Sequence, residues 1–194
     1  SCNNDGLCFP DLCFFEPEIR VEVKQSSVTI EGIGCCEFKK ELERVDICFS
    51  EVDIPEIKSR ISRKEYLDNV IKLKEHIQLG DVFEVNFCQE FFVENFYFDP
   101  VSLYRKLVEK SPVPFAGFLK IKGYYCLGTS PERFLKRSGL KLVSQPIKGT
   151  KKRGETKEED EIQINQLKDS IKERSENVMI VDLVRNDLSK VANK

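Results

Sequence analysis

The sequence predicts an α+β fold in which helices cover antiparallel strands. Runs rich in aromatic and β-branched residues indicate strands, and segments that begin with capping residues and have helical apolar spacing indicate helices. Along the chain the order is strands, helix, strands, helix, strands, helix. This order fits an α+β fold of layers better than a regular βαβ alternation. With 194 residues, 40% hydrophobic and 33% charged, the chain is expected to be globular and to bury a core.

The first part of the chain predicts a strand pair followed by a connector. Residues 1–11 are small and polar and are expected to form a lead-in without regular structure. Ile19–Lys24 and Val28–Glu31 have the composition of two strands with a turn between them. The polar segment Glu51–Ser62 contains a proline and is interpreted as a connector.

A capped helix and a long strand are expected next. Ser62 and Glu65 have the spacing of a capping box, which predicts a helix that runs to Leu79 and ends at Gly80. The predicted inward face of this helix consists of Leu67, Val70, Ile71 and Ile77. Val82–Glu94 is dominated by phenylalanine and valine and predicts one long strand.

The second half predicts a helix, four strands and a further helix. Asp99 followed by Pro100 begins a helix that reaches about Lys110. Thr156 and Glu159 form a second capping box, and the helical pattern after it continues beyond Met179. The four strands between these helices are predicted over Phe115–Lys120, Tyr124–Leu127, Arg133–Lys136 and Leu140–Val143.

Composition excludes several classes of partner and site. The formal net charge of −2 gives no preference for nucleic acid, and no apolar run has the length of a membrane span. Without a secretory leader pattern, a cytoplasmic location is expected. The eight cysteines have irregular spacing and His76 is the only histidine. Reduced, mostly buried thiols are therefore expected, and a zinc site is poorly supported.

A hairpin with its turn at Ser138 and Gly139 would place a carboxyl and an amine at the same end. In that register Glu132 lies opposite Gln145, and Lys148 follows at the end of the hairpin where Glu132 lies. The two side chains would then be within reach of one small molecule. An ordinary salt bridge at the rim of the hairpin explains the same spacing.

Two further features allow both a functional and a plain interpretation. Glu173 and Glu176 share a helix face, with Asp169 one turn earlier. Such a face either binds Mg²⁺, which takes one or two carboxylates together with water and substrate oxygens, or is simply solvated. The segment Pro146–Thr150 also has two interpretations. Gly149 permits a tight backbone whose amide groups could face a ligand, and the plain alternative is a loop with an exposed lysine.

Three motifs follow one another in the second half of the chain: Ser130-Pro-Glu-Arg-Phe134, Pro146-Ile-Lys-Gly-Thr150 and Glu176-Asn-Val-Met-Ile-Val-Asp-Leu-Val-Arg-Asn-Asp187. Gly80-Asp-Val-Phe-Glu-Val-Asn86 and Phe14-Phe-Glu-Pro-Glu18 add to them. Together these motifs resemble the chorismate-binding enzymes, which include anthranilate, aminodeoxychorismate, isochorismate and salicylate synthases. The resemblance is strong from about Lys64 onward and weaker before it. The resemblance implies the layered sandwich of antiparallel sheets covered by helices that anthranilate synthase component I has.

Lysine at position 148 resembles the aminodeoxychorismate (para-aminobenzoate) synthase branch, since the similar anthranilate synthases carry alanine here. This branch implies that Lys148 is a nucleophile that attacks C2 of chorismate, and that Glu132 is the general acid that protonates the departing C4 hydroxyl. Ammonia then attacks C4 and gives 4-amino-4-deoxychorismate, a precursor of para-aminobenzoate and folate. Lys148 must be neutral to attack, so burial or cationic neighbours such as Lys151, Lys152 and Arg153 would have to lower its pKa.

The resemblance also implies a metal, substrate contacts and a partner. Glu176 and Glu173 would be ligands of Mg²⁺, and the backbone around Gly149 and Thr150 would contact chorismate. A glutamine amidotransferase subunit would supply the ammonia.

The alternatives are an anthranilate synthase component I and, from another class, a non-catalytic fragment that binds a partner or itself. Residues 1–61 are interpreted as the remnant of an N-terminal region, and residues 62–194 as the first half of the catalytic domain. The later motifs of this family are not in the sequence. The isolated chain is therefore expected to be inactive, to bind Mg²⁺ weakly and to be prone to self-association.

Overall fold

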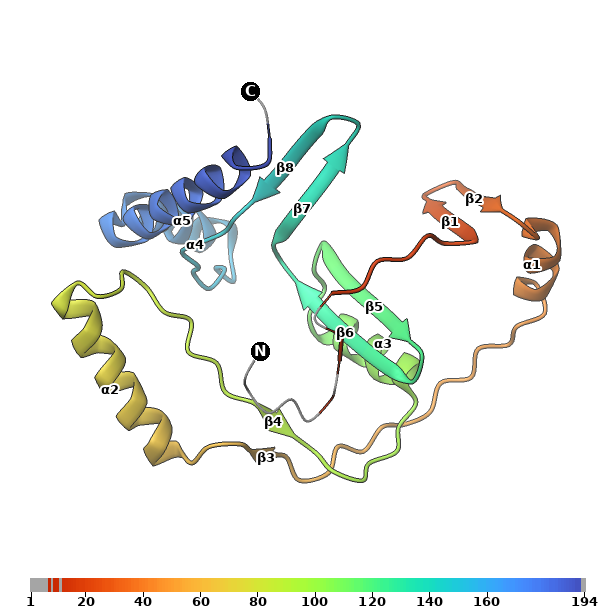
Figure 1. Cartoon of the computed structure of the whole chain (residues 1–194), viewed down its shortest axis with the longest axis horizontal. Coiled ribbons are helices and arrows are strands. Elements are labelled where there is room, and N and C mark those ends of the chain that lie inside the picture. The colour runs from red at the N-terminus through yellow and green to blue at the C-terminus, as the bar shows by residue number, and fades with distance from the viewer. Residues whose placement is uncertain (1–6, 8, 11, 193–194) are drawn as a thin grey trace. The chain divides into compact units, whose positions relative to one another are not determined.

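The protein, described by a computed structural model over residues 7, 9–10 and 12–192, combines helices with antiparallel strand pairs (Figure 1). The predicted α+β class is therefore confirmed. The chain forms two compact units, Ser1–Leu103 and Tyr104–Lys194. The expected lead-in over residues 1–11 lies mostly outside the described residues, and the predicted division at residue 61 stays a prediction.

The first unit opens with the predicted strand pair. Strand β1 (Ile19–Lys24) pairs antiparallel with β2 (Ser27–Gly32). Helix α1 (Cys35–Leu42) follows and was not predicted. Its N-cap is Gly34, which makes no side-chain capping bond, so the usual sequence signal for a helix start is missing.

Helix α2 (Arg63–Leu79) has the predicted bounds. The Ser62 hydroxyl accepts a hydrogen bond from the Glu65 backbone N–H at 3.2 Å, and Gly80 ends the helix with φ 82. The predicted inward face is wrong for Leu67, Ile71 and Ile77, which are all exposed. Their exposed fractions are 43%, 56% and 39%, respectively.

Removing the cap of α2 is expected to loosen its first turn. In Ser62→Ala the Glu65 N–H loses its acceptor, and a lost N-cap costs about 1 kcal/mol. We expect the Glu65 amide to exchange its hydrogen roughly fivefold faster. Ser62→Asp retains a side-chain acceptor and is the matched control. Equal exchange in Ser62→Ala and the unaltered chain would contradict the assigned cap.

The prediction of one long strand over Val82–Glu94 is wrong. Only β4 (Phe91–Phe92) is a strand there, and it pairs antiparallel with β3 (Lys58–Ser59) inside the expected connector. The apolar pattern of residues 82–94 shows only that these residue types favour strands. A strand also needs backbone partners, and the described residues supply them only at this short ladder.

Helix α3 (Pro100–Lys110) crosses the boundary between the two units and has the predicted bounds. The Asp99 carboxylate accepts bonds from the Ser102 backbone N–H at 2.8 Å and from the Ser102 hydroxyl at 2.5 Å. These bonds, the hydroxyl bond first, hold the pKa of Asp99 below its usual value. Tyr104 packs edge-on against Phe118 of β5 (Phe115–Ile121), with ring centroids 5.4 Å apart. Strand β5 pairs antiparallel with β6 (Tyr124–Ser130).

The β7–β8 hairpin has a different register from the predicted one. Strand β7 (Arg133–Ser138) pairs with β8 (Lys141–Gln145), and Ser138 lies opposite Lys141. The two central turn residues are therefore Gly139 and Leu140, shifted by one from the predicted pair. Gly139 has φ 59, which suits the first central position of a type II′ turn. A register shift between Arg133 and Lys136 then brings Arg133 opposite Gln145, so the predicted pairing of Glu132 with Gln145 is wrong.

Two helices replace the single helix predicted at the C-terminal end. Helix α4 (Lys157–Asp169) begins with the predicted capping box of Thr156 and Glu159. Ser170 has an extended backbone, with ψ 111, and caps the next helix, α5 (Ile171–Ser189). Its hydroxyl accepts a bond from the Glu173 backbone N–H at 3.4 Å. The pattern Ser170-Ile-Lys-Glu173 is a capping-box spacing, and this signal in the sequence indicated the break.

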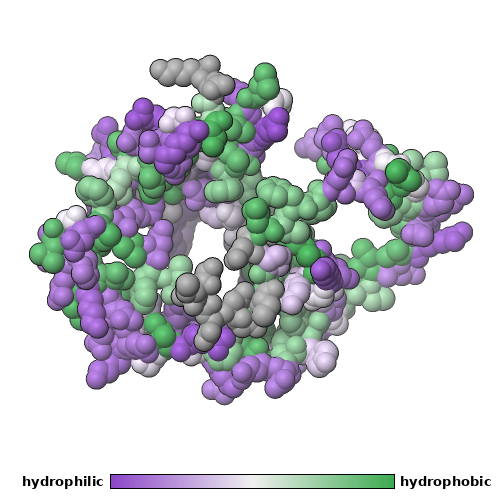
Figure 2. Space-filling view, viewed as in Figure 1, coloured by the Kyte–Doolittle hydropathy of each residue, from purple (hydrophilic) through white to green (hydrophobic). Residues whose placement is uncertain are grey.

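The described residues bury little apolar surface, so the expected core is not found among them. Val52 is the one buried hydrophobic residue and Ser102 the one buried polar residue that they contain. Apolar side chains are visible at the surface over much of the chain (Figure 2). In the described part of the chain no helix is both long and apolar enough to cross a membrane.

The cysteines were expected to be reduced and mostly buried. All six in the described residues are free thiols, and five of them are exposed. Cys2 and Cys8 lie outside the described residues. The thiol state was therefore predicted correctly for these six and their burial was not.

Candidate active site

Glu132 lies between β6 and β7, where a tight turn fixes its backbone. The Ser130 hydroxyl accepts a bond from the Glu132 N–H at 3.2 Å and donates to the Glu132 carbonyl at 3.1 Å. The half-buried Glu132 side chain reaches the loop after β8, where its Oε1 accepts a bond from the Ile147 backbone N–H at 2.9 Å. The structure therefore places this carboxylate on the backbone one residue before Lys148, in spite of the different register.

The loop that carries Lys148 runs close to α5. Lys148 is half-buried, whereas Thr150 is exposed. Gly149 has φ 79, and a Cβ built there would lie 2.8 Å from Oε2 of Glu173 and 3.0 Å from its Cβ. The left-handed backbone favours glycine at this position, and a methyl group there would require the Glu173 side chain to shift.

The predicted metal ligands lie on the first turns of α5. The side chains of Glu173 and Glu176 are 27% and 37% exposed, and the Lys172 ammonium lies 3.8 Å from the first and 3.6 Å from the second. The described residues contain no group of three or more metal-binding side chains. They therefore offer a pair of carboxylates at most, and Asp169, at the end of α4, belongs to the preceding helix.

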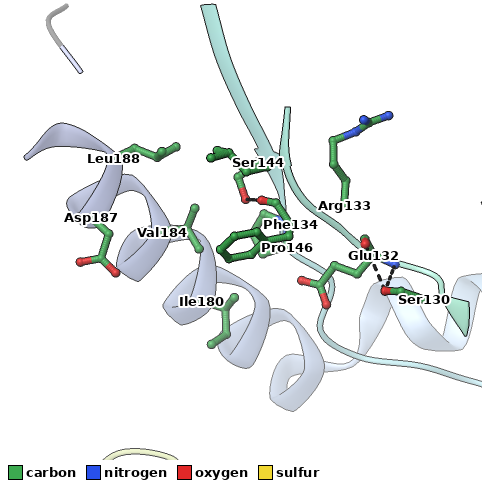
Figure 3. Close-up of a pocket in the computed structure, with 11 residues that line it drawn as sticks. Ser130, Glu132, Arg133, Phe134, Ser144, Pro146, Ile180, Val184, Asp187 and Leu188 are labelled. Atoms are coloured by element: carbon green, nitrogen blue, oxygen red, sulfur yellow. Dashed lines mark hydrogen bonds between the residues drawn. The ribbon is translucent and has the colours of Figure 1, made fainter. Parts of the chain in front are cut away.

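A cavity of about 460 Å³ lies between the β7–β8 hairpin and α5 (Figure 3). This volume is in the range of small-molecule sites. Glu132 and Asp187 are its acidic residues, and the apolar part of its wall consists of Phe134, Leu135, Pro146, Ile180, Val184 and Leu188. Lys148 and Gly149 are not among the lining residues, so Glu132 is the residue that connects the cavity with the Lys148 loop.

The cavity wall on α5 continues directly into the acidic pair. Ile180 and Val184 occupy the helix face that Glu173 and Glu176 occupy one to two turns earlier, because all four positions are separated by three or four residues. The sequence interpretation identified the glutamates and missed this apolar wall and Asp187. The helical spacing of apolar residues in the motif that begins at Glu176 was the signal that could have identified this wall.

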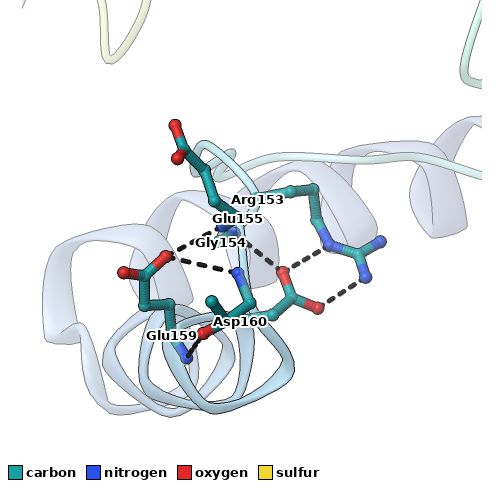
Figure 4. Close-up of polar contacts among 6 residues, drawn as sticks. Arg153, Gly154, Glu155, Glu159 and Asp160 are labelled. Carbon is teal, nitrogen blue, oxygen red and sulfur yellow. Dashed lines mark hydrogen bonds and ion pairs between the residues drawn. The ribbon is translucent and has the colours of Figure 1, made fainter.

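Farther along the same loop, the side chain of Arg153 is directed at α4 (Figure 4). The two nitrogens of the Arg153 guanidinium donate to the Asp160 carboxylate at 2.6 and 2.5 Å. The Lys151 ammonium donates to the side-chain oxygen of Gln166. Lys151 and Arg153 were expected as cationic neighbours of Lys148, but their charges are directed at α4.

The contact with Arg153, and then the backbone N–H of Gly154, hold the pKa of Asp160 below its usual value. A lowered pKa means that the ionised form stabilises this turn above the ordinary aspartate pKa of about 4. The contribution is lost as the pH falls through the lowered value. NMR titration of the Asp160 carboxyl should therefore give a midpoint below that of an exposed aspartate, and Arg153→Gln should move it back. An unshifted midpoint in the unaltered protein would contradict the ion pair.

Comparison with known proteins places these residues in one family. The family model described as chorismate binding enzyme matches residues 10–194. Anthranilate synthase component 1 of Acetivibrio thermocellus is 40% identical over 136 residues, which are 70% of this chain and 27% of that protein. A probable anthranilate synthase component 1 of Schizosaccharomyces pombe is 38% identical over 213 aligned residues, covering 97% of this chain and 43% of that protein.

The fold has a counterpart of known structure. Anthranilate synthase component I from Streptococcus pneumoniae TIGR4 matches with a TM-score of 0.67 and 26% identity, over 81% of this chain and 34% of that one. This likeness agrees with the predicted fold. The chain thus spans less than half of the length of each of these relatives.

Proposed function

Because the chain belongs to the chorismate binding enzyme family, we propose that it carries part of the site of an enzyme that aminates chorismate. One observation supports the proposal most strongly. The Glu132 carboxylate, which lines the cavity, accepts a hydrogen bond from the backbone N–H next to Lys148. An acid and an amine-bearing loop thus meet at the edge of a cavity of suitable size.

In the proposed reaction Glu132 and Lys148 divide acid and nucleophile roles. The neutral Lys148 amine attacks C2 of chorismate as the bond from C4 to its hydroxyl breaks. Glu132 donates the proton with which this hydroxyl leaves as water. Ammonia then attacks C4, the bond between C2 and the lysine nitrogen breaks, and the free amine is restored. The product is 4-amino-4-deoxychorismate.

Amination at C2 is the second candidate, and overall similarity favours it. The relatives named above are anthranilate synthases. Sequence identity over most of the chain reflects the shared fold, which amination at C2 and amination at C4 both need. The choice of carbon depends on whether a nucleophile is present, and Lys148 is the residue that favours C4.

The proposed Mg²⁺ would be held by Glu173 and Glu176. The chemistry of these donors fits, because Mg²⁺ takes one or two carboxylates from a protein and completes its shell with water and substrate oxygens. Mg²⁺ bound there would neutralise negative charge on the substrate carboxylate. The Lys172 ammonium lies 3.8 and 3.6 Å from the two carboxylates and also offsets part of their negative charge.

The proposed partner is a glutamine amidotransferase subunit that supplies ammonia, and the proposed location is the cytoplasm. A non-catalytic, self-associating fragment is the candidate from another class. The exposed apolar side chains of Leu67, Ile71 and Ile77 on α2 support it. Light scattering of residues 1–194 at several concentrations tests it, and a strictly monomeric chain would count against it.

Product identification tests the proposed function directly. The full-length enzyme is incubated with chorismate, Mg²⁺ and ammonium, and the product is purified and identified by mass spectrometry. We expect 4-amino-4-deoxychorismate, which keeps the enolpyruvyl side chain. Anthranilate would establish the second candidate, and unchanged chorismate or a product without new nitrogen would refute amination.

A further inference from the structure

The loop between β8 and α4, residues 146–156, has no helix or strand and carries Lys148. Such a segment keeps one conformation only where contacts offset its conformational entropy. On the upstream side the contacts are the Glu132 bond to Ile147 and the close approach of Gly149 to Glu173. The downstream side is held by the first turn of α4.

Asp160 provides the charged part of this downstream attachment. Its side chain is 15% exposed, and both of its oxygens are used. Oδ1 accepts from Nε of Arg153 at 2.6 Å and from the Gly154 backbone N–H at 3.0 Å. Oδ2 accepts from the other guanidinium nitrogen at 2.5 Å. A bidentate pair of this kind fixes both distance and orientation.

Gly154 lets the loop lie directly on the helix. A Cβ built at this residue would lie 2.2 Å from the Asp160 backbone nitrogen and 2.6 Å from the carbonyl carbon of Glu159. Both obstacles are backbone atoms of α4, which cannot move aside as the end of a flexible side chain does. Any residue with a side chain would therefore push the loop away from α4.

We propose that Arg153, Gly154 and Asp160 form a clamp that positions Lys148 for its reaction with the substrate. The three are positioning residues, since none of them lines the cavity beside Glu132. The inference rests on the proposed role of Lys148. Between Lys148 and the clamp, the Lys151 ammonium also donates to the side chain of Gln166 on α4, so the clamp acts together with this contact. A displacement of about 1 Å at a reacting group can cost on the order of 100-fold in rate.

The test uses variants from both sides of the clamp in the full-length enzyme. Asp160→Asn removes the charge and turns an N–H group toward the guanidinium, and Arg153→Gln removes the bidentate donor. Thr156→Ala is the matched control, because it removes the N-cap of the same helix and leaves the clamp residues unchanged. Amide exchange of the loop and kcat with KM for chorismate are measured for each variant.

We expect the amides of residues 148–151 to exchange roughly tenfold faster in both clamp variants. We also expect kcat to fall by about 10- to 100-fold with little change in KM. The control should change neither quantity by more than about threefold, and the double variant should be no worse than the worse single variant, because the two residues act as one unit.

Two results would overturn the clamp. Unchanged loop exchange in both clamp variants would show that the clamp does not hold the loop. Faster exchange with an unchanged kcat would show that the clamp does not position Lys148. Failure of the unaltered enzyme to aminate chorismate would instead refute the proposed function, and the exchange comparison would then still decide whether the clamp holds the loop.

Discussion

Replacing Lys148 by alanine is expected to abolish C4 amination, with a fall in kcat on the order of 10³-fold or more. The amine is the proposed nucleophile, and no methyl group can take over its role. In this variant Glu132 can still bind the loop backbone through the N–H of Ile147. Steady-state rates with chorismate and ammonium measure the effect.

The same variant separates the two candidate reactions. The family resemblance implies that anthranilate synthases carry alanine at the position of Lys148. If the enzyme aminates C2, Lys148→Ala should therefore retain a rate within about tenfold of the original, a loss far below that expected for a missing nucleophile. Lys148→Arg keeps the positive charge, lacks a neutral amine at working pH, and should be as inactive as the alanine variant. An active arginine variant would contradict the nucleophile role.

Replacing Glu132 by glutamine is expected to lower kcat by roughly 10²- to 10⁴-fold, the usual contribution of a general acid. Glutamine keeps a side-chain oxygen that can accept the bond from Ile147 N–H, so the loop retains its anchor. Only the transferable proton is lost. The rate should fall while KM for chorismate changes little.

Glu132→Ala is the matched comparison, because it removes the proton and the anchor together. We expect it to be slower than Glu132→Gln and to increase amide exchange at Ile147. If the glutamine variant keeps full activity, Glu132 is not the acid. If only the alanine variant is impaired, Glu132 serves the loop alone.

The local elements of this fold were largely predictable because their signals are local. Ser62, Asp99 and Thr156 each mark a helix start through one side-chain bond to the following turn. The strands over residues 115–145 alternate with turns that the composition identifies. The helix break at Ser170 had the same kind of signal, which was overlooked within a longer helical pattern.

Features that depend on distant partners were harder to predict. The segment 82–94 has strand-forming residues, yet it forms ladder bonds only where Lys58 and Ser59 lie beside it. The hairpin register followed the φ of Gly139 and a bulge after Arg133, and composition determines neither. The Arg153–Asp160 pair was not predicted, because the spacing does not show that the loop turns back onto α4.

The candidate site was predictable in its members and not in its layout. Glu132 and Lys148 were identified by motif and Glu173 by its helical spacing from Glu176. The structure places Glu132 and Glu173 against the backbone on either side of Lys148. The cavity wall of α5 escaped notice, because an apolar stripe is the usual sign of a helix that packs on a core. Here Ile180 and Val184 face a cavity.

Trapping the covalent intermediate is the most direct test that Lys148 and Glu132 act on one chorismate molecule. The full-length enzyme is quenched in acid during a single turnover without ammonia and digested, and the peptide that contains Lys148 is sequenced by mass spectrometry. We predict an adduct on Lys148 with the mass of chorismate less one water, formed much more slowly in Glu132→Gln. Amination at full rate with an unmodified Lys148 peptide throughout the turnover would contradict this.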